Sequence, residues 1–315
     1  MFANCAIHTR RSRSCKVARV PLALVTGAST GIGRATALRL AAGGWTVLAG
    51  VREEAAGERL QAEAQVGTGN RAGAGSGGRL VPLDLDVTDA AQVEAARERV
   101  AQQAACVGGS AHGGLDALVN NAGIGVGGPL ELVSAEDLRR QFDVNVLAQV
   151  AVTQAMLPAL RAAHGRVVFV SSIGGRVAMA FTAPYAASKH AIEALADALR
   201  VELRSSGVQV ALVEPGSVAT PIWEKARADA DGMALPPQLE GVYGPALAAM
   251  RETLEKTAGR GVPAERVADT IAGALAARRM RARYVVGVDA WAMLIAKRLL
   301  PEHLFDRVAR RALGV

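Results

Sequence analysis

The sequence predicts a single doubly wound parallel sheet of about seven strands with helices on both faces, which is an α/β fold. Two observations lead to this class. From Val20 onward, short apolar runs suited to buried strands alternate with longer stretches of helical spacing. Half of the 315 residues are apolar and about a fifth are charged, which is ordinary for a folded domain with a large core. Because no internal repeat is visible, residues 20–288 are expected to form one domain.

The strands and helices of this domain are expected to alternate along the chain, joined by right-handed crossovers. The predicted strands are 20–26, 45–51, 80–83, 116–120, 166–170, 208–213 and 284–288. The predicted helices are 32–42, 53–64, 90–105, a long one that begins at Ser134, 182–205 and 265–277. Ser134 is expected to cap its helix, because Asp137 follows three residues later. Between Pro221 and Gly261 no motif is apparent.

The net charge of +7 is concentrated at the two ends of the chain. Residues 1–20 hold five basic side chains and no acidic one, whereas residues 278–315 hold nine basic and three acidic, so the body between them carries −4. A protein that reads nucleic acid more often places positive charge on a folded face, so no nucleic-acid partner is expected. Residues 1–19 are interpreted as a disordered basic tail, although their Arg- and Ser-rich composition also fits a transit peptide.

Residues 289–315 are predicted to form two short amphipathic basic helices separated at Pro301. Their apolar residues recur near helical spacing: Trp291, Leu294, Ile295 and Leu299, then Leu304, Phe305, Val308 and Leu313. Three uses compete for this stripe. It can cover the core, act as a lid over an apolar substrate, or make a peripheral contact with an anionic membrane.

The cysteine and histidine patterns argue against a metal. Cys5, Cys15 and Cys106 are too few and too scattered for a disulfide framework, and no two histidines are spaced as zinc ligands. We therefore expect no metal site and a cytoplasmic location. No apolar run approaches the ~18–20 residues that span a bilayer, and the N-terminus lacks the apolar stretch of a secretory signal.

A turn with three glycines lies between the first predicted strand and the first predicted helix: Thr26-Gly27-Ala28-Ser29-Thr30-Gly31-Ile32-Gly33. This is the position at which a dinucleotide-binding turn is expected. Glycines let the backbone approach a pyrophosphate, and the helix N-terminus offers unpaired N–H groups and the positive end of the helix dipole. Taken alone, such a turn can equally be a tight connection.

Tyr185 and Lys189 lie one helical turn apart on the same face of a predicted helix. Of the three tyrosines, only Tyr185 has a lysine four residues later. Free tyrosine titrates near ~10, and a neighbouring ammonium is expected to lower that pKa toward neutral pH. Ser172, at the end of the fifth strand, can hold a substrate oxygen while charge develops there, and Ser171 is the competing serine.

In this glycine turn and these spacings the chain resembles the short-chain dehydrogenase/reductase family, from about Val20 to Thr220. The branch containing hydroxysteroid and retinol dehydrogenases is the most similar, through the stretches 84–88, 123–125, 128–130 and 188–193. The resemblance implies a Rossmann-type fold, a nicotinamide cofactor and a dimer or tetramer. The helices from Ser134 and from Thr182 are expected to pair with copies of themselves through small residues: Ala148, Ala151, Ala155, Ala191, Ala194 and Ala198.

The resemblance also implies a role for each matched segment. The catalytic set it implies is Asn145, Ser172, Tyr185 and Lys189, with Asn145 organising a water path to the lysine. Near the adenine the implied residues are Asp86 and Val87, and beside the cofactor they are Asn121, Ala122 and Gly123. The loop that closes over the nicotinamide contributes Pro215, Gly216, Val218 and Thr220, while Tyr185 and Lys189 also touch the cofactor.

The residues after the second strand indicate which dinucleotide is used. Relatives that prefer NAD place an acid there to hold the ribose 2′-hydroxyl. This chain has Val51 at that position and Arg52 next, and a guanidinium can clasp a 2′-phosphate. Glu53 and Glu54 follow closely, and the alternative is a solvated arginine in a loop.

The sequence thus predicts an NADP(H)-dependent oxidoreductase that interconverts a carbonyl and a primary or secondary alcohol. Its small-molecule substrate is expected to be lipophilic, steroid-like or retinoid-like, by resemblance to that branch. One alternative is an NAD-dependent dehydrogenase of the same family. Another is a non-catalytic NADP-sensing protein, but such proteins typically lack the tyrosine or the lysine, and both are present here.

Overall fold

A computed structural model describes residues 20–68, 78–106, 114–220, 235–258 and 261–312. The predictions for residues 1–19 and for Leu313 lie outside this range. Seven parallel strands form one sheet in the order β3-β2-β1-β4-β5-β6-β7. The strands are β1 (Leu22–Val25), β2 (Thr46–Val51), β3 (Arg79–Asp84), β4 (Ala117–Asn120), β5 (Arg166–Val170), β6 (Gln209–Pro215) and β7 (Arg283–Val286). The predicted fold class is confirmed.

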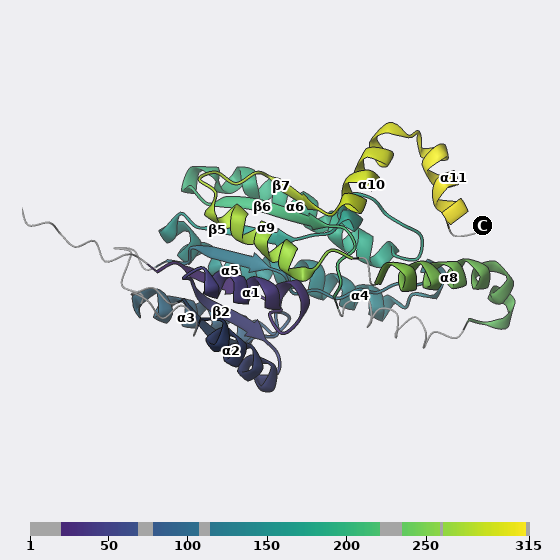
Figure 1. The fold of residues 1–315 in the computed structure, drawn as a ribbon. Helices are drawn as coiled ribbons and strands as arrows, with labels where there is room; N and C mark the ends of the chain where they lie inside the picture. Colours follow the sequence, from purple (N-terminus) through teal and green to yellow (C-terminus); the bar gives the residue numbers. More distant parts are fainter. Residues whose placement is uncertain (1–19, 69–77, 107–113, 221–234, 259–260, 313–315) are drawn as a thin grey trace, which may run out of the picture.

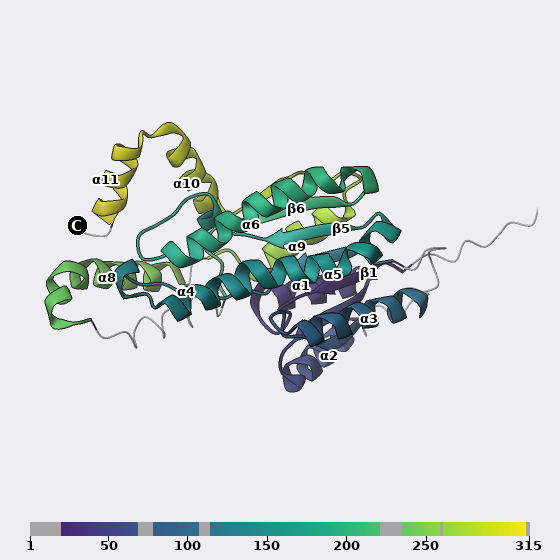
Figure 2. The same ribbon diagram turned by 180° about the vertical axis from the view of Figure 1, so that it is seen from behind.

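Helices cover both faces of the sheet, and the strands between them are almost continuously apolar, as sheets buried on both sides require. One face packs against α1 (Gly31–Ala42), α2 (Glu54–Thr68) and α9 (Ala264–Ala276), of which α1 and α9 lie in front of the sheet in Figure 1. The other packs against α3 (Ala90–Cys106), α5 (Ala148–Ala163) and α6 (Ala183–Glu202), which face the viewer in Figure 2.

The helix expected to run unbroken from Ser134 is divided in the structure. It consists of α4 (Ala135–Phe142), a π-helical turn over Asp143–Leu147, and α5. The Ser134 hydroxyl accepts a hydrogen bond from the Asp137 amide at 2.9 Å, so the predicted cap is confirmed. The wider turn contains Asn145, whose side chain is fully buried.

The combined helix Ala135–Ala163 is long and apolar enough to cross a membrane by length and composition. The sequence contains no uninterrupted apolar run that predicts such a helix. Its buried side chains Val152, Met156 and Leu160 pack against the sheet, together with residues of β4 and β5. It is therefore a core helix of the domain.

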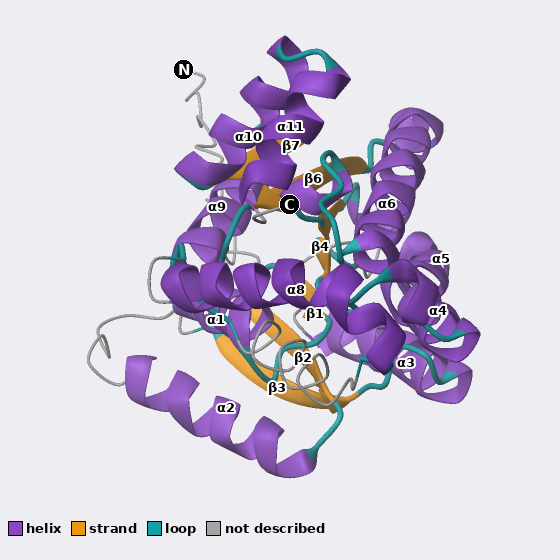
Figure 3. Ribbon diagram, turned by 90° about the vertical axis from the view of Figure 1, so that its right-hand side faces the viewer, coloured by secondary structure: helices purple, strands orange, loops and turns teal. Residues whose placement is uncertain are grey.

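The C-terminal part departs from the prediction in two places. A helix, α8 (Pro237–Ala258), lies within the stretch that carries no motif, and Figure 3 shows it crossing in front of the sheet. The last strand ends at Val286, two residues earlier than expected, because Gly287 has a φ of 113° and turns the chain out of the sheet.

Two helices follow, α10 (Val288–Leu299) and α11 (Glu302–Ala312), so the predicted pair separated at Pro301 is confirmed. The pair extends away from the sheet (Figure 1). The apolar stripe does not cover a core, because Trp291, Ile295 and Leu299 are 54%, 52% and 73% exposed. Ala290, on the opposite side of α10, is fully buried and anchors the start of the helix.

Candidate active site

A cavity of about 770 Å³ opens where the chain leaves the carboxyl ends of the strands. It lies at the point where the strand order reverses, between β1 and β4, which is where open α/β sheets bind ligands. Most of the predicted site residues line it: Gly27, Ser29, Thr30, Gly31, Ile32, Arg52, Asp86, Val87, Asn121, Ala122, Gly123, Ser172, Tyr185, Lys189, Pro215, Gly216, Val218 and Thr220. Gly33 and Asn145 do not line it.

The glycine turn places the N-terminus of α1 at this cavity. Thr30 is the N-cap, and the first turn of α1 carries no acidic side chain that would repel an anion. Gly33 was predicted to bind the cofactor, but it lies behind the turn. A Cβ at Gly33 would collide with the carbonyl oxygen of Gly27, so Gly33 allows the helix to pack closely onto the turn.

The end of β4 holds the turn in place through Asn121. Its Nδ2 donates to the carbonyl oxygens of Thr26 and Gly27, both at 3.0 Å. The Thr26 hydroxyl in turn accepts the amides of Asn121 and Ala122, both at 3.0 Å. Asn121 therefore fixes the shape of the turn as well as lining the cavity.

Arg52 and Asp86 lie at the end of the cavity where β2 and β3 terminate. Val51 is buried in the sheet, whereas Arg52 is exposed and lines the cavity. The Asp86 carboxylate accepts hydrogen bonds from the Thr88 hydroxyl at 2.6 Å and the Thr88 amide at 2.9 Å. These bonds, with a smaller contribution from Arg52, hold the pKa of Asp86 below its ordinary value.

Ser172 and Tyr185 approach each other from β5 and α6. Burial raises the pKa of the Tyr185 phenol above its ordinary value, and a hydrogen bond with the Ser172 side chain opposes part of that rise. The Ser172 hydroxyl also accepts the amide of Gly174 at 3.1 Å, which fixes its direction. Ser171 also lines the cavity, but its side chain lowers the pKa of Glu193 instead. The structure thus pairs Ser172, not Ser171, with the tyrosine.

Lys189 is 4% exposed, and its ammonium donates to the carbonyl oxygen of Val170 at 2.8 Å. The Nζ atom lies 5.8 Å from the centre of the Tyr185 ring. Burial lowers the pKa of Lys189 to about 8, and the negative charge of Glu193 opposes the shift. The expected lowering of the tyrosine pKa by this lysine is not found here, because burial of the phenol dominates.

Asn145 reaches the site through a buried chain of side-chain hydrogen bonds. Its Nδ2 donates to the Ser188 hydroxyl at 3.1 Å, and that hydroxyl donates to the carbonyl oxygen of Tyr185 at 2.7 Å. Gln141, also fully buried, donates to the same hydroxyl at 3.2 Å. Asn145 further bonds both the amide and the carbonyl of Ile124. It therefore positions α6 and the loop after β4.

Several cavity residues were not predicted from the sequence. Helix α4 and the π-turn contribute four charged residues to the lining: Glu136, Arg139, Arg140 and Asp143. Their spacing places them on one side of successive turns, a pattern that would otherwise indicate a solvated helix face. Gln141 and Ser188 carry no motif of their own, and only the packing of α4 against α6 reveals their contact.

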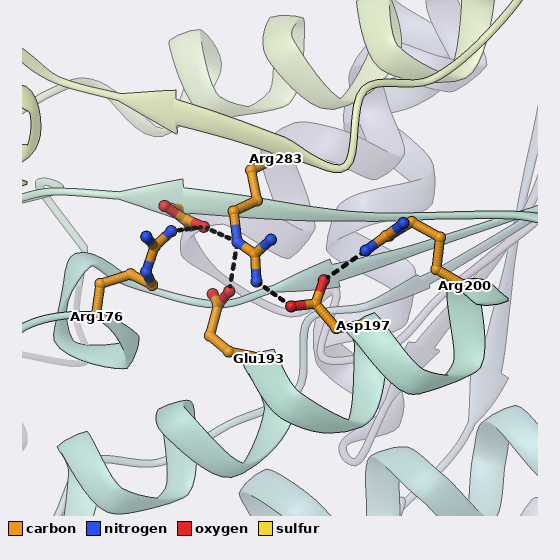
Figure 4. Close-up of polar contacts among 6 residues, drawn as sticks. Arg176, Glu193, Asp197, Arg200 and Arg283 are labelled. Carbon is orange, nitrogen blue, oxygen red and sulfur yellow. Dashed lines mark hydrogen bonds and ion pairs between the residues drawn. The ribbon is translucent and has the colours of Figure 1, made fainter.

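A network of charged side chains connects α6 to the last two strands, β6 and β7 (Figure 4). Arg283 on β7 contacts Glu193 and Asp197 on α6, and also Glu214 on β6. Arg176 approaches Glu214 at 3.3 Å from the other side. Glu193 and Glu214 are both buried, so two carboxylates share the positive charge of these arginines.

In the described residues no group of three or more histidine, cysteine, aspartate or glutamate side chains is arranged to hold a metal. The cavity instead combines a glycine turn at a helix N-terminus with a serine, a tyrosine and a lysine. This combination defines an α/β oxidoreductase that uses a nicotinamide dinucleotide.

The sequence comparison gives the family. A family model described as short chain dehydrogenase matches residues 21–231, so the chain belongs to that family. It is 35% identical over 291 residues to the NADPH-dependent 3-dehydrocapnine reductase of Ornithobacterium rhinotracheale, covering 91% of this chain and 95% of that protein. It is 34% identical over 308 residues to mouse retinol dehydrogenase 5, covering 95% and 90%.

Among solved structures, a short chain dehydrogenase/reductase from Burkholderia phymatum in complex with NAD is similar, with a TM-score of 0.70 and 27% identity. The match covers 89% of this chain and 92% of that one. The two relatives cover 91% and 95% of this chain. The protein is therefore a short-chain dehydrogenase with retinol dehydrogenase-like relatives.

Proposed function

We propose that this protein is an NADP(H)-dependent oxidoreductase that interconverts a carbonyl and a primary or secondary alcohol. The observation that carries the proposal is the meeting of Ser172, Tyr185 and Lys189 in the same cavity as the glycine turn. A nicotinamide bound in this cavity would supply hydride to the carbonyl carbon, and the Tyr185 hydroxyl would supply the proton that the carbonyl oxygen takes up in reduction. Ser172 holds that oxygen, and Lys189 supplies positive charge beside the tyrosine.

The preference for NADP(H) rests on Arg52. It lines the cavity at the end of β2, directly after the buried Val51 that replaces an acid. A guanidinium at this place favours a 2′-phosphate, where a carboxylate would repel it. The name of the O. rhinotracheale relative supports the same cofactor, whereas the NAD complex of the B. phymatum protein supports the alternative.

We propose a lipophilic substrate, steroid-like or retinoid-like in its apolar bulk. The similarity to a retinol dehydrogenase supports this class, and Ile124 and Val144 supply apolar surface to the cavity. A non-catalytic NADP-sensing role is the weaker alternative, because the tyrosine, lysine and serine are all present and gathered.

The other surfaces support three further proposals. A cytoplasmic location rests on the few, scattered cysteines. A homodimer or homotetramer rests on the exposed Ala151, Ala194 and Ala198 of α5 and α6. For the C-terminal helices, we propose a peripheral contact with an anionic membrane through the exposed stripe. The lid is less favoured, since no described residue of α10 or α11 lines the cavity.

The test is oxidation of NADPH and of NADH, followed by absorbance, with ketones and aldehydes of graded hydrophobicity. We expect turnover with NADPH at a kcat/KM at least about tenfold above that with NADH, rising with substrate hydrophobicity. Turnover with NADH alone would select the NAD-dependent alternative. Tight NADPH binding without turnover on any substrate, in either direction, would select the non-catalytic one.

A further inference from the structure

The first turn of α10 reaches back to the loop that follows β6. Oδ2 of Asp289 accepts a hydrogen bond from the amide of Ser217 at 2.7 Å. Ser217 lies between Gly216 and Val218, which both line the cavity. The two segments are 72 residues apart in the chain, and the contact joins the C-terminal helices to the rim of the cofactor cavity.

Two glycines leave room for this carboxylate. A Cβ built on Gly216 would collide with both oxygens of Asp289, and one built on Gly287 would collide with Oδ1. Gly216 belongs to the cavity loop and Gly287 to the turn that ends β7. Because neither segment has a side chain at this point, the Asp289 carboxylate fits closely between them.

Among the residues that the structure describes, backbone bonds hold the rest of the loop. The amide of Gly216 donates to Val286 at 2.8 Å, the amide of Ala219 donates to Val262 at 3.1 Å, and the Ser217 carbonyl accepts the amide of Val262 at 2.8 Å. Asp289 thus supplies the acceptor for the Ser217 amide, which these backbone bonds do not use. Within the described residues, the Asp289 carboxylate makes no ion pair with a basic side chain.

From these contacts we infer that Asp289 is a positioning residue for the cofactor, holding the 215–220 loop in the conformation that closes the nicotinamide end of the cavity. The inference rests on the proposed function, since it takes this loop to be the nicotinamide loop. An amide held by a carboxylate is bound more firmly than one held by a neutral acceptor or by water. Loss of the carboxylate therefore allows the loop to take other conformations, which a bound dinucleotide must reorder.

This role predicts a pattern that differs from that of Arg52. The nicotinamide end is the same in both dinucleotides, so Asp289→Ala is expected to weaken NADPH and NADH by a similar factor, on the order of tenfold. Asp289→Asn keeps a neutral acceptor oxygen and is expected to lose only about two- to threefold. Arg52→Ala is expected to weaken NADPH alone.

The matched control is Glu302→Ala. Glu302 is the acidic residue in the first turn of α11, so it has the same relation to its helix dipole as Asp289 has to that of α10. It is exposed, and it is not among the residues that line the cavity. We expect its dissociation constants for both cofactors to equal those of the unmodified protein.

The experiment is a fluorescence titration of the full-length protein with NADPH and with NADH, beside the Tm of each variant without cofactor. Equal losses for both cofactors in Asp289→Ala, with partial recovery in Asp289→Asn, would support the inference. Unchanged dissociation constants with a lowered Tm would reduce Asp289 to a structural residue and overturn it. If the unmodified protein bound neither cofactor, the proposed function would fail together with the inference.

A second variant covers the case in which Asp289→Ala does not fold. Gly216→Ala places a methyl group against the carboxylate and is expected to weaken both cofactors by a similar factor. In the double variant Gly216→Ala/Asp289→Asn the carboxylate charge is lost but most of the crowding remains, so binding should be no better than with Gly216→Ala. Gly216→Ala with undiminished affinity would also contradict the inference.

Discussion

The Nε atom of Arg283, on β7, lies 3.0 Å from Oε2 of Glu193, on α6. The same nitrogen lies 2.9 Å from a carboxylate oxygen of Glu214, on β6. Glu193 follows Lys189 by one helical turn, and Glu214 immediately precedes the cavity loop. One arginine therefore connects α6, β6 and the edge strand β7. This arrangement buries two carboxylates close to each other.

This burial makes stability depend on pH through Glu193. Burial, together with the charge of Glu214, raises the pKa of Glu193 to about 7, although Ser171 and Arg283 lower it in part. In the unfolded chain the group titrates near 4.5. Between these values the folded state holds more protons, so this contribution to stability is complete below about pH 4.5 and is lost as pH rises through about 7.

We therefore expect the Tm of Glu193→Gln to fall less between pH 5 and pH 8 than that of the unmodified protein. The two decreases should differ by roughly 2–4 °C for each 1 kcal/mol of unfolding free energy that the unmodified protein loses through Glu193. The control is Glu202→Gln, an exposed residue near the end of the same helix. Calorimetry over this pH range measures the difference. A parallel decrease in the two proteins would show that Glu193 does not titrate in it.

Tyr185→Phe should lower kcat by at least about a hundredfold while leaving NADPH binding nearly intact, because only the proton donor is removed. Single-turnover kinetics and fluorescence titration separate the two effects. Ser172→Ala should also lower kcat strongly, and Ser171→Ala much less, since only Ser172 bonds the tyrosine. The opposite ranking of the two serines would transfer the role to Ser171.

Arg52→Ala should weaken NADPH binding by about ten- to a hundredfold and leave NADH binding nearly unchanged. The expected loss corresponds to one charge-assisted contact with the 2′-phosphate. Arg59→Ala, on the exposed side of α2, is a suitable control because Arg59 does not line the cavity. Equal weakening of both cofactors by Arg52→Ala would argue against a phosphate contact.

The exposed stripe of α10 should bind the protein to vesicles with anionic headgroups. Trp291→Ser/Ile295→Ser is expected to weaken binding to phosphatidylglycerol vesicles by at least about a hundredfold and so to abolish most flotation, because each apolar side chain removed loses about 1.5–3 kcal/mol of burial. Vesicles of phosphatidylcholine should bind weakly, since Lys297 and Arg298 flank the stripe. Unchanged flotation of the double variant would remove the membrane proposal, and turnover of a small ketone checks that it is folded.

Copies of α5 and α6 are expected to meet across a subunit interface. Ala148, Ala155 and Ala191 pack against the core of their own chain, so the faces left for a partner carry Ala151, Ala194 and Ala198. Leu195 and Val201 are exposed on α6, and Leu147 is exposed at the end of the π-turn that precedes α5. Light scattering at micromolar concentration should give a dimer or tetramer mass, and Ala194→Arg should reduce it. A monomer mass for the unmodified protein would contradict the expectation.

The order of strands and helices could be predicted from the sequence, because buried parallel strands and amphipathic helices leave different periodicities. Two boundaries could not. The π-turn at Asn145 has no helix-breaking residue, and the contact that Asn145 makes there is with Ile124, which lies 21 residues away in the chain. Helix α8 contains Pro245 and lies in a stretch rich in glycine and proline. Because these residues usually interrupt helices, the stretch was not predicted to be helical.

For the site, local motifs identified most of the cavity lining, because the glycine turn, Ser172 and the Tyr185–Lys189 pair each follow one strand or occupy one helix. Gly33 was assigned to the cofactor by its place in the motif, and only the close approach of Gly27 shows that it serves packing. Other site contacts could not be predicted from residue type alone. They are the bond of Thr88 to Asp86 within a turn and the bond of Gln141 to Ser188 between two helices.

The sequence by itself determined the fold class and the family, and it identified the residues that we propose for the chemistry, since each of these depends on patterns within a short stretch of chain. The tertiary structure decided what lies beside those residues. Glu193, Glu214 and Arg283 come from three different elements, and Asp289 meets Ser217 across 72 residues. The pKa values of buried groups and the position of the cavity loop depend on such contacts, because desolvation and hydrogen bonding act through space and not along the chain.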